Sequence, residues 1–381
     1  MLPPLALYVH IPWCVRKCPY CDFNSHERGG ALPEKEYVGK LLEDLESLLP
    51  SVWGRRLSSV FIGGGTPSLF APESIDALLS GVRARLPLEP GAEITLEANP
   101  GTVEAGRFRG FRDAGVSRIS VGVQSFDDAM LKALGRIHGA DEARRAVESA
   151  LAAFDNVNLD LMYGLPGQSV AMARADIEAG VATGVPHLSA YQLTIEPNTV
   201  FFSKPPQLPE HDLSADMQVM IEELLNENKF EHYETSAFAR PGHRCRHNLN
   251  YWEFGDYLGI GAGAHGKISF PDRITRHSRM KQPREYLAAQ DTLVEHKTIP
   301  AAELPFEFML NALRLPYGFS IALFQERTGL PFTVISSQLK AAEEKGLLER
   351  DLKQVRPTNK GQRFLNELLE LFLDGERKDP G

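Results

Sequence analysis

The sequence predicts an α/β protein, a partial (β/α)6 TIM-like barrel followed by a small winged-helix-like domain. Two observations predict this fold. Six short apolar runs rich in β-branched residues alternate with helical segments, which is the pattern of βαβ units and a parallel sheet. From about Ile299 the pattern changes to helix, turn, helix, helix, hairpin and helix, which is typical of a winged helix.

Each βα unit is visible in the sequence as a strand followed by an amphipathic helix. The six predicted strands cover residues 5–11, 57–62, 93–97, 118–122, 157–162 and 188–194. The six predicted helices cover residues 34–49, 72–85, 103–114, 127–134, 141–154 and 169–183. In a barrel of this kind the chemistry lies at the carboxyl ends of the strands.

The rest of the chain divides into two further parts. After Asn198 we expect a helix over residues 212–228, a strand-like run over 230–238, and a loop that carries His247 and the glycine-rich segment 259–266. The small domain should contain a hairpin wing at 347–356, a final helix at 358–373, and a frayed tail at 375–381. We therefore predict a barrel at 1–235, a connecting segment at 236–298, and a C-terminal domain at 299–375.

Composition excludes several classes of function. The chain has 381 residues, is 43% hydrophobic and 24% charged, and carries a net charge of −9. An acidic chain argues against nucleic acid as a partner, and the winged domain is also balanced, with 11 Lys and Arg against 12 Asp and Glu over residues 301–381. No signal peptide or membrane span is visible, although contact with a membrane surface stays open. Clustered cysteines favour a reducing, cytoplasmic location.

Three cysteines, Cys14, Cys18 and Cys21, form a C-x3-C-x2-C motif directly after the first predicted strand. Three thiolates can hold three irons of a [4Fe–4S] cluster and leave the fourth iron open for another ligand. Two alternatives stand beside this interpretation. The cysteines could hold zinc with His10 or His26 as the fourth ligand, or they could be redox thiols.

Further polar and glycine residues stand where the other predicted strands end. Glycines in Gly63-Gly64-Gly65-Thr66-Pro67 would let the backbone approach a ligand. Elsewhere, Glu97 could be an exposed residue or pair with Arg118, and an isolated arginine such as Arg136 is often only solvated. The remaining polar groups at strand ends are Gln124 and Asp160.

Together these motifs resemble the radical S-adenosylmethionine (SAM) superfamily, in which the open iron chelates SAM. The resemblance implies a [4Fe–4S] cluster with Cys14, Cys18 and Cys21 as ligands, and SAM as the second cofactor. By the same resemblance, the residues that would contact SAM are Tyr8, Tyr20, Gly64, Gly65, Thr66, Glu97, Gln124, Arg136, Asp160, Thr194 and His265. Thr194 and His265 match the family pattern only loosely.

Over nearly its whole length the chain resembles the oxygen-independent coproporphyrinogen III dehydrogenase (HemN-like) group. Three features depart from those enzymes. Phe23 stands where they carry a fourth cysteine, and the first cysteine comes at residue 14, without their long N-terminal extension. The string His247-Asn248-Leu249-Asn250-Tyr251-Trp252 resembles the H-N-x-x-Y-W signature of the HemW branch, whose members are haem chaperones.

The signature also makes chemical sense as a haem contact. A neutral imidazole such as His247 is a common axial ligand of haem iron, and Tyr251 and Trp252 offer flat apolar faces to a porphyrin. Nearby His243 or Cys245 could compete for the iron. The opposite interpretation is a structural histidine with Tyr and Trp packed in the core.

We therefore expect a haem chaperone that binds haem, a [4Fe–4S] cluster and SAM, and delivers haem to acceptor haemoproteins. A reductant such as flavodoxin or ferredoxin is a further expected partner. The runner-up is oxidative decarboxylation of coproporphyrinogen III, and a third interpretation is an interaction module with a structural cluster. Whether the chain is an enzyme stays open at this stage.

Overall fold

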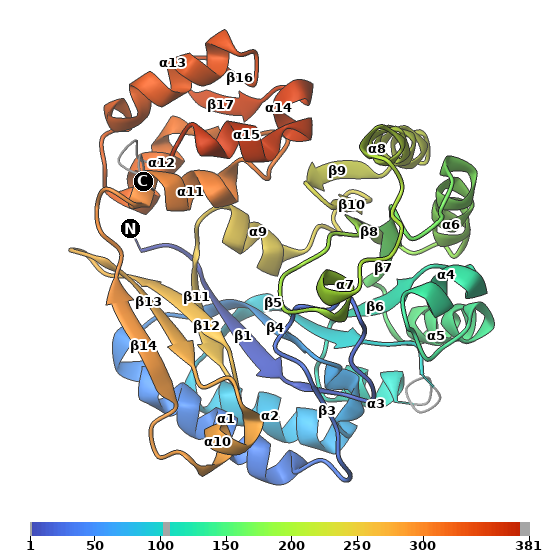
Figure 1. The fold of residues 1–381 in the computed structure, drawn as a ribbon. Helices are drawn as coiled ribbons and strands as arrows, with labels where there is room; N and C mark the ends of the chain where they lie inside the picture. The colour runs from blue at the N-terminus through green and yellow to red at the C-terminus, as the bar shows by residue number, and fades with distance from the viewer. Residues whose placement is uncertain (1, 102–106, 374–381) are drawn as a thin grey trace.

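The computed structural model describes residues 2–101 and 107–373. Its centre is a curved parallel sheet whose strands follow one another in chain order (Figure 1). All six predicted strands are confirmed, as β1 (Leu5–Ile11), β4 (Leu57–Gly64), β5 (Leu88–Ala98), β6 (Arg118–Gln124), β7 (Val157–Tyr163) and β8 (His187–Gln192). These strands are largely buried, as expected of a parallel sheet with both faces covered.

Helices between the strands pack on the outside of this sheet (Figure 1). They are α1 (Glu34–Leu48), α2 (Pro72–Arg85), α3 (Phe108–Asp113), α4 (Asp128–Ala133), α5 (Ala140–Ala153) and α6 (Val170–Ala182). The start of the helix predicted at 103–114 falls outside the described residues. Local signals fix some starts: Asp127 accepts hydrogen bonds from the backbone of Ala129 and Met130 at the beginning of α4.

The sheet continues beyond the barrel on both sides and has twelve strands within the described residues. At one edge β8 pairs with the hairpin of β10 (Ala237–Ala239) and β9 (Glu231–Glu234). At the other edge β1 pairs in parallel with β11 (Asp256–Ile260), and three antiparallel strands follow. Those strands are β12 (His265–Ser269), β13 (Ile274–Arg279) and β14 (Leu293–Thr298).

Two expectations for this middle part of the chain are wrong. Residues 259–266 are no open loop, since they form the end of β11, a tight turn and the start of β12. Gly259 is needed there because a Cβ atom on it would lie 1.9 Å from the carbonyl oxygen of His265. His247 is also not in a loop, because it lies in the short helix α9 (Arg246–Trp252). The predicted strand at 230–238 is divided into β9 and β10.

Several short elements complete the barrel part. The helix predicted at 212–228 is confirmed as α8 (His211–Glu227). Some short elements were not predicted from the sequence. They are α7 (Val200–Ser203), α10 (Pro283–Ala288), the 3-10 turns η1 (Leu49–Val52) and η2 (Pro67–Leu69), and the two-stranded pair β2 (Trp13–Cys14) and β3 (His26–Glu27).

The C-terminal part has the predicted winged-helix layout and its own aromatic core around Phe308, Phe319 and Phe324. The final helix is not continuous, because Phe364 leaves the helical conformation and separates α14 from α15. The elements are α11 (Leu304–Ala312), β15 (Phe319–Ser320), α12 (Ile321–Thr328), η3 (Phe332–Ile335), α13 (Ser336–Glu344), β16 (Leu348–Arg350), β17 (Gln354–Pro357), α14 (Asn359–Arg363) and α15 (Leu365–Glu370).

Helix α9 lies between this C-terminal part and the sheet (Figure 1). Phe254, just after α9, packs edge-on against Phe308 of α11 and so joins the two parts. No helix within the described residues is long and apolar enough to cross a bilayer.

Candidate functional site

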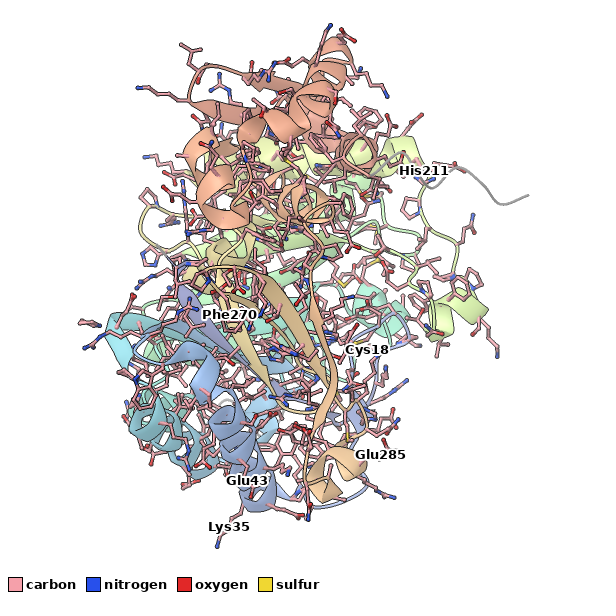
Figure 2. All side chains as sticks on the ribbon, turned by 90° about the vertical axis from the view of Figure 1, so that its left-hand side faces the viewer. Cys18, Lys35, Glu43, His211, Phe270 and Glu285 are labelled. Carbon is pink, nitrogen blue, oxygen red and sulfur yellow. The ribbon has the colours of Figure 1, made fainter. Side chains whose placement is uncertain are left out.

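The three clustered cysteines lie on the loop that leaves β1. Cys14 ends β2, and β2 pairs with β3, so that the loop between them is closed at its base. A turn with a 3.1 Å hydrogen bond from the backbone nitrogen of Cys21 to the carbonyl of Cys18 brings the last two cysteines together. All three are free, half-buried thiols. Figure 2 shows Cys18 below the C-terminal part, near the middle of the molecule.

Each of the three sulfur atoms has a polar partner. The Thr66 hydroxyl donates to Cys14 Sγ at 3.6 Å, and Arg136 Nη1 donates to Cys18 Sγ at 3.7 Å. The Ser25 hydroxyl lies 3.7 Å from Cys21 Sγ. Hydrogen bonds to cluster thiolates stabilise their charge and set the reduction potential of a cluster. These partners therefore suit thiolate ligands.

The donor set is chemically suited to an iron–sulfur cluster. Cysteine thiolates are the usual protein ligands of a [4Fe–4S] cluster, and three of them leave the fourth iron open. Within the described residues, no three His, Cys, Asp or Glu side chains are grouped as ligands of a single metal ion.

Glycines at the end of β4 let this strand touch the cysteine loop. The backbone nitrogens of Gly65 and Thr66 donate to the carbonyls of Ile11 and Trp13, both at 2.8 Å. A Cβ atom on Gly65 would lie 2.6 Å from the Trp13 carbonyl oxygen. Gly64 has φ +121°, a conformation that other residues rarely adopt. The glycine run therefore fixes the cysteine loop against the barrel.

A cavity of about 350 Å³ opens beside the cysteines and gathers most of the predicted SAM residues. It is lined by Cys14, Cys18, Cys21, Tyr20, Gly64, Gly65, Thr66, Glu97, Gln124, Arg136, Asp160 and Thr194. Tyr8 and His265 do not line it and instead face a second cavity. The cavity therefore brings together residues from six different strands or the loops after them, at the carboxyl ends of the parallel strands.

Two carboxylic acids, Glu97 and Asp160, line this cavity. Glu97 Oε2 accepts a 3.0 Å hydrogen bond from the Gly64 backbone nitrogen. Burial, together with the negative charge of Asp160, raises the pKa of Glu97 to about 8. Burial also raises the pKa of Asp160, although Ser120 and Asn158 donate hydrogen bonds to it at 2.9 Å. Such acids are suited to accept bonds from hydroxyl groups of a ligand.

Arg136 is held by the protein itself. Its guanidinium donates to the Gly122 carbonyl at 2.7 Å, to the Asn99 side chain, and to Cys18. Gln124, at the end of β6, has φ +70° at a shift in strand register, and backbone strain of this kind often marks a functional site. Sequence reasoning missed Asn99, although it follows Glu97 by only two residues.

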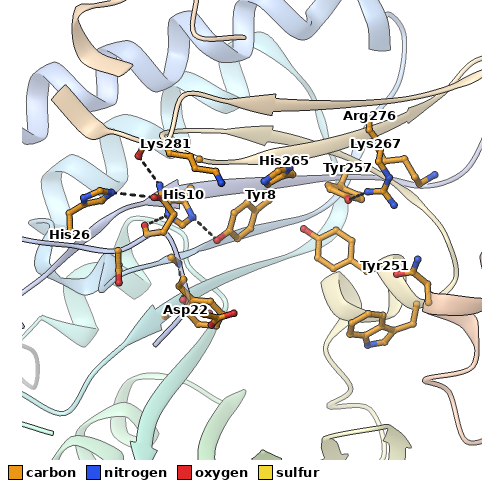
Figure 3. Close-up of a pocket in the computed structure, with 18 of the residues that line it drawn as sticks. Tyr8, His10, Asp22, His26, Tyr251, Tyr257, His265, Lys267, Arg276 and Lys281 are labelled. Carbon is orange, nitrogen blue, oxygen red and sulfur yellow. Dashed lines mark hydrogen bonds between the residues drawn. The ribbon is translucent and has the colours of Figure 1, made fainter. Parts of the chain in front are cut away.

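The second cavity is larger, about 700 Å³, and lies between α9, β12 and the cysteine loop (Figure 3). It shares Gly64, Glu97 and the loop residues Asp22, Phe23 and Ser25 with the first cavity, so the two lie side by side. Tyr251 and Trp252 line it, and their contact with a ligand stays a prediction. Sequence reasoning missed Tyr257, Lys267, Arg276 and Lys281. Tyr257 falls in the part that was read as a loop, and no strand was predicted over residues 267–298.

His247 does not line either cavity. It is 1% exposed, and both of its ring nitrogens are engaged. Nδ1 lies 3.0 Å from the Ser59 hydroxyl, and Nε2 lies 3.0 Å from the Tyr251 hydroxyl. Burial lowers its pKa to about 3. In this conformation no ring nitrogen is available to an iron, so the prediction of His247 as an axial ligand is not supported by its geometry.

The two other candidate iron ligands, Cys245 and His243, are no better placed than His247 to bind haem iron. Cys245 is 1% exposed, and burial raises the pKa of its thiol to about 12, so it stays protonated at neutral pH. His243 lines neither of the two cavities.

Comparison with known proteins decides the family. The model described as "Radical SAM superfamily" matches residues 8–179, and the "HemN C-terminal domain" matches residues 299–364. The heme chaperone HemW of Escherichia coli is 51% identical over 98% of this chain and 99% of its own length. The chain belongs to the HemW family. HemW of Haemophilus influenzae is 49% identical over the same shares, and HemW of Lactococcus lactis is 33% identical over 97% of each chain.

HemW membership includes the radical SAM fold, and that superfamily implies a [4Fe–4S] cluster and SAM. Among solved structures, coproporphyrinogen III oxidase (HemN) of Escherichia coli superposes with a TM-score of 0.82 over 97% of this chain and 90% of that one. Sequence identity to it is 21%, so this likeness concerns the fold, which is the predicted partial barrel with its C-terminal domain.

Proposed function

We propose that this protein binds haem in the 700 Å³ cavity and passes it to acceptor haemoproteins. The observation that carries the proposal is the cavity itself. It lies beside the cysteine site and has Tyr251 and Trp252, at the end of α9, in its wall. Its volume is typical of a site for a ligand of this size, and flat aromatic side chains face it. The name heme chaperone, carried by relatives of up to 51% identity, supports haem delivery over the two alternatives.

We further propose that Cys14, Cys18 and Cys21 hold a [4Fe–4S] cluster and that SAM occupies the 350 Å³ cavity. When bound, these groups supply one-electron chemistry. The protein's own residues hold these groups in place and stabilise their charges. Thr66, Ser25 and Arg136 stabilise the thiolates, and the acids at strand ends can accept hydrogen bonds from the ribose hydroxyls. The turn from Gly64 to Thr66 holds the cysteine loop, which lies between the two cavities, against the barrel.

Haem transfer to an apo-haemoprotein tests this function. The anaerobically reconstituted protein is loaded with haem, freed of excess by gel filtration, and mixed with the apo-form of a b-type cytochrome. We expect transfer that depends on the concentration of the acceptor, followed by the change in the Soret band. Transfer no faster than from free haemin, or no haem retained after gel filtration, would contradict the proposal.

A second measurement separates a SAM-cleaving protein from an inert module. Reduction with dithionite in the presence of SAM should release 5′-deoxyadenosine if the cluster and the SAM cavity are functional. No release with a fully loaded cluster would favour the purely structural role.

A further inference from the structure

Three histidines line the larger cavity, and they differ in whether their ring nitrogens form hydrogen bonds. His10 has both nitrogens engaged, since Nδ1 lies 2.9 Å from the Tyr8 hydroxyl and Nε2 lies 2.9 Å from the Asn24 carbonyl oxygen. His26 Nε2 lies 3.2 Å from the Asn24 side chain oxygen. His265 forms no side-chain hydrogen bond within the described part of the chain and is the exposed first residue of β12.

The backbone of His265 is held in place by strand pairing, whereas its imidazole ring forms no hydrogen bond within the described residues. Its backbone pairs with Ser278 of β13, and the tight turn before it is fixed by hydrogen bonds from Arg279 and Ala264 to neighbouring carbonyls. Figure 3 shows the His265 ring beside Tyr8 and Tyr257 on the strand side of the cavity. A free imidazole on a rigid strand is well suited to bind a metal centre held in the cavity.

Aromatic side chains on either side could hold a flat macrocycle near this ring. Tyr251 from α9 packs edge-on against Tyr257 from β11, with ring centroids 4.5 Å apart. Phe23, on the cysteine loop, is 61% exposed and lines both cavities. An exposed phenylalanine at the rim of a cavity has no packing role in the protein itself and can cover one face of a bound ring.

Cations at the same cavity suit the carboxylates of a porphyrin. Lys281 and Lys17 are both exposed and line it. Lys281 forms no ion pair within the described residues. Burial, and after it the positive charge of Lys281, lowers the pKa of the His265 imidazole. Arg276 also lines the cavity, although it is already paired with Glu307 and Tyr257.

We propose that His265, rather than His247, is the axial ligand of haem iron in this cavity, with Lys281 facing a porphyrin carboxylate. This inference rests on the proposed haem binding. His247 then acts as a positioning residue, because its bond to Tyr251 fixes the aromatic wall opposite the strands. The H-N-x-x-Y-W string would therefore shape the cavity without touching the iron.

Haem titrations of variants separate the two histidines. His265→Gly should lose the spectrum of an imidazole-ligated haem and bind haem at least about tenfold more weakly. Free imidazole, added in millimolar amounts, should restore that spectrum in His265→Gly. His247→Gln should weaken binding but keep the imidazole-ligated spectrum in electron paramagnetic resonance. The matched control is His211→Gly, which removes an exposed histidine that lines neither cavity and should change neither spectrum nor affinity.

The outcomes distinguish this inference from the proposed function. Wild-type protein that binds no haem would overturn the proposed function and the inference together. Wild-type binding with an unchanged spectrum in His265→Gly would overturn only the assignment of His265. Loss of the imidazole spectrum in His247→Gln, at full cluster content and an unchanged circular dichroism spectrum, would restore His247 as the ligand. Lys281→Ala should raise the Kd about threefold to tenfold without changing the spectrum.

Discussion

His247 and Tyr251 lie one turn apart on α9, and their side chains meet in a 3.0 Å hydrogen bond between Nε2 and the phenolic oxygen. The other ring nitrogen of His247 contacts Ser59 of β4, so the histidine connects the barrel wall to the tyrosine of the larger cavity. His247 therefore acts as a buried brace within the signature string. When the sequence is read alone, an imidazole in this string can be mistaken for an iron ligand.

Replacement of Cys18 tests the cluster site. Cys18→Ala should abolish the brown absorbance of the reconstituted cluster, because one iron loses its thiolate. Iron and acid-labile sulfide are measured after anaerobic reconstitution. The control is Cys245→Ala, which removes a buried thiol far from the loop and should leave the iron content unchanged. Full iron retention in Cys18→Ala would contradict the ligand assignment.

Gly65→Ala should lower the cluster content without touching a cysteine. The added methyl group would lie 2.6 Å from the Trp13 carbonyl oxygen and push the cysteine loop away from β4. Gly39→Ala in α1 is the control, since no atom lies within 4 Å of its new Cβ and alanine favours a helix by about 1 kcal/mol. Equal iron contents in the two variants would show that the close approach has no effect on the loop.

The raised pKa of Glu97 makes stability depend on pH. Between pH 4.5 and about 8 the unfolded chain has released the Glu97 proton and the folded chain has kept it. The folded state therefore binds more protons, and the free energy of unfolding falls as pH rises, by up to about 1.4 kcal/mol per pH unit. Glu97→Gln removes the contribution of this carboxyl group to the pH dependence of the free energy of unfolding.

Urea unfolding of the wild type and Glu97→Gln is compared from pH 5 to pH 8. The variant should lose less stability over this range than the wild type does. Part of the dependence will remain, because Asp160 is buried in the same cavity and its pKa is also raised. Identical pH slopes in both proteins would be evidence against a protonated Glu97.

Asp256 holds the strands that carry the wall of the larger cavity. Its carboxylate is fully buried and accepts bonds from Arg55 at 2.8 Å, from Lys267 at 3.1 Å and from Ser269. Asp256→Ala leaves Arg55 and Lys267 without an acidic partner and should cost about 3–5 kcal/mol in the free energy of unfolding. The control is exposed Asp272→Ala, for which denaturant unfolding should show a change within about 0.5 kcal/mol.

Sequence alone predicted the six parallel strands because strands buried on both faces appear as continuous apolar runs. It also predicted most residues of the smaller cavity, since the carboxyl ends of parallel strands meet at one edge. The residues at 259–266 were misread because glycine indicates a loop in sequence, whereas Gly259 here permits the close contact of β11 and β12.

The role of His247 could not be predicted, because its partner Ser59 is 188 residues away in the chain. A pattern of residue types gives no information on whether a ring nitrogen is free. The same holds for His265, which the motif resemblance assigned to SAM and the fold places in the larger cavity. The pairing of β12 with β11 and β13 determines which cavity this side chain faces.

The most direct test of the central claim is a haem titration of the anaerobically reconstituted wild-type protein, followed by the Soret band and by gel filtration. Binding of one haem per chain that survives gel filtration, with the spectrum of an imidazole-ligated iron, is the predicted result. A protein with a complete cluster that retains no haem would contradict the account.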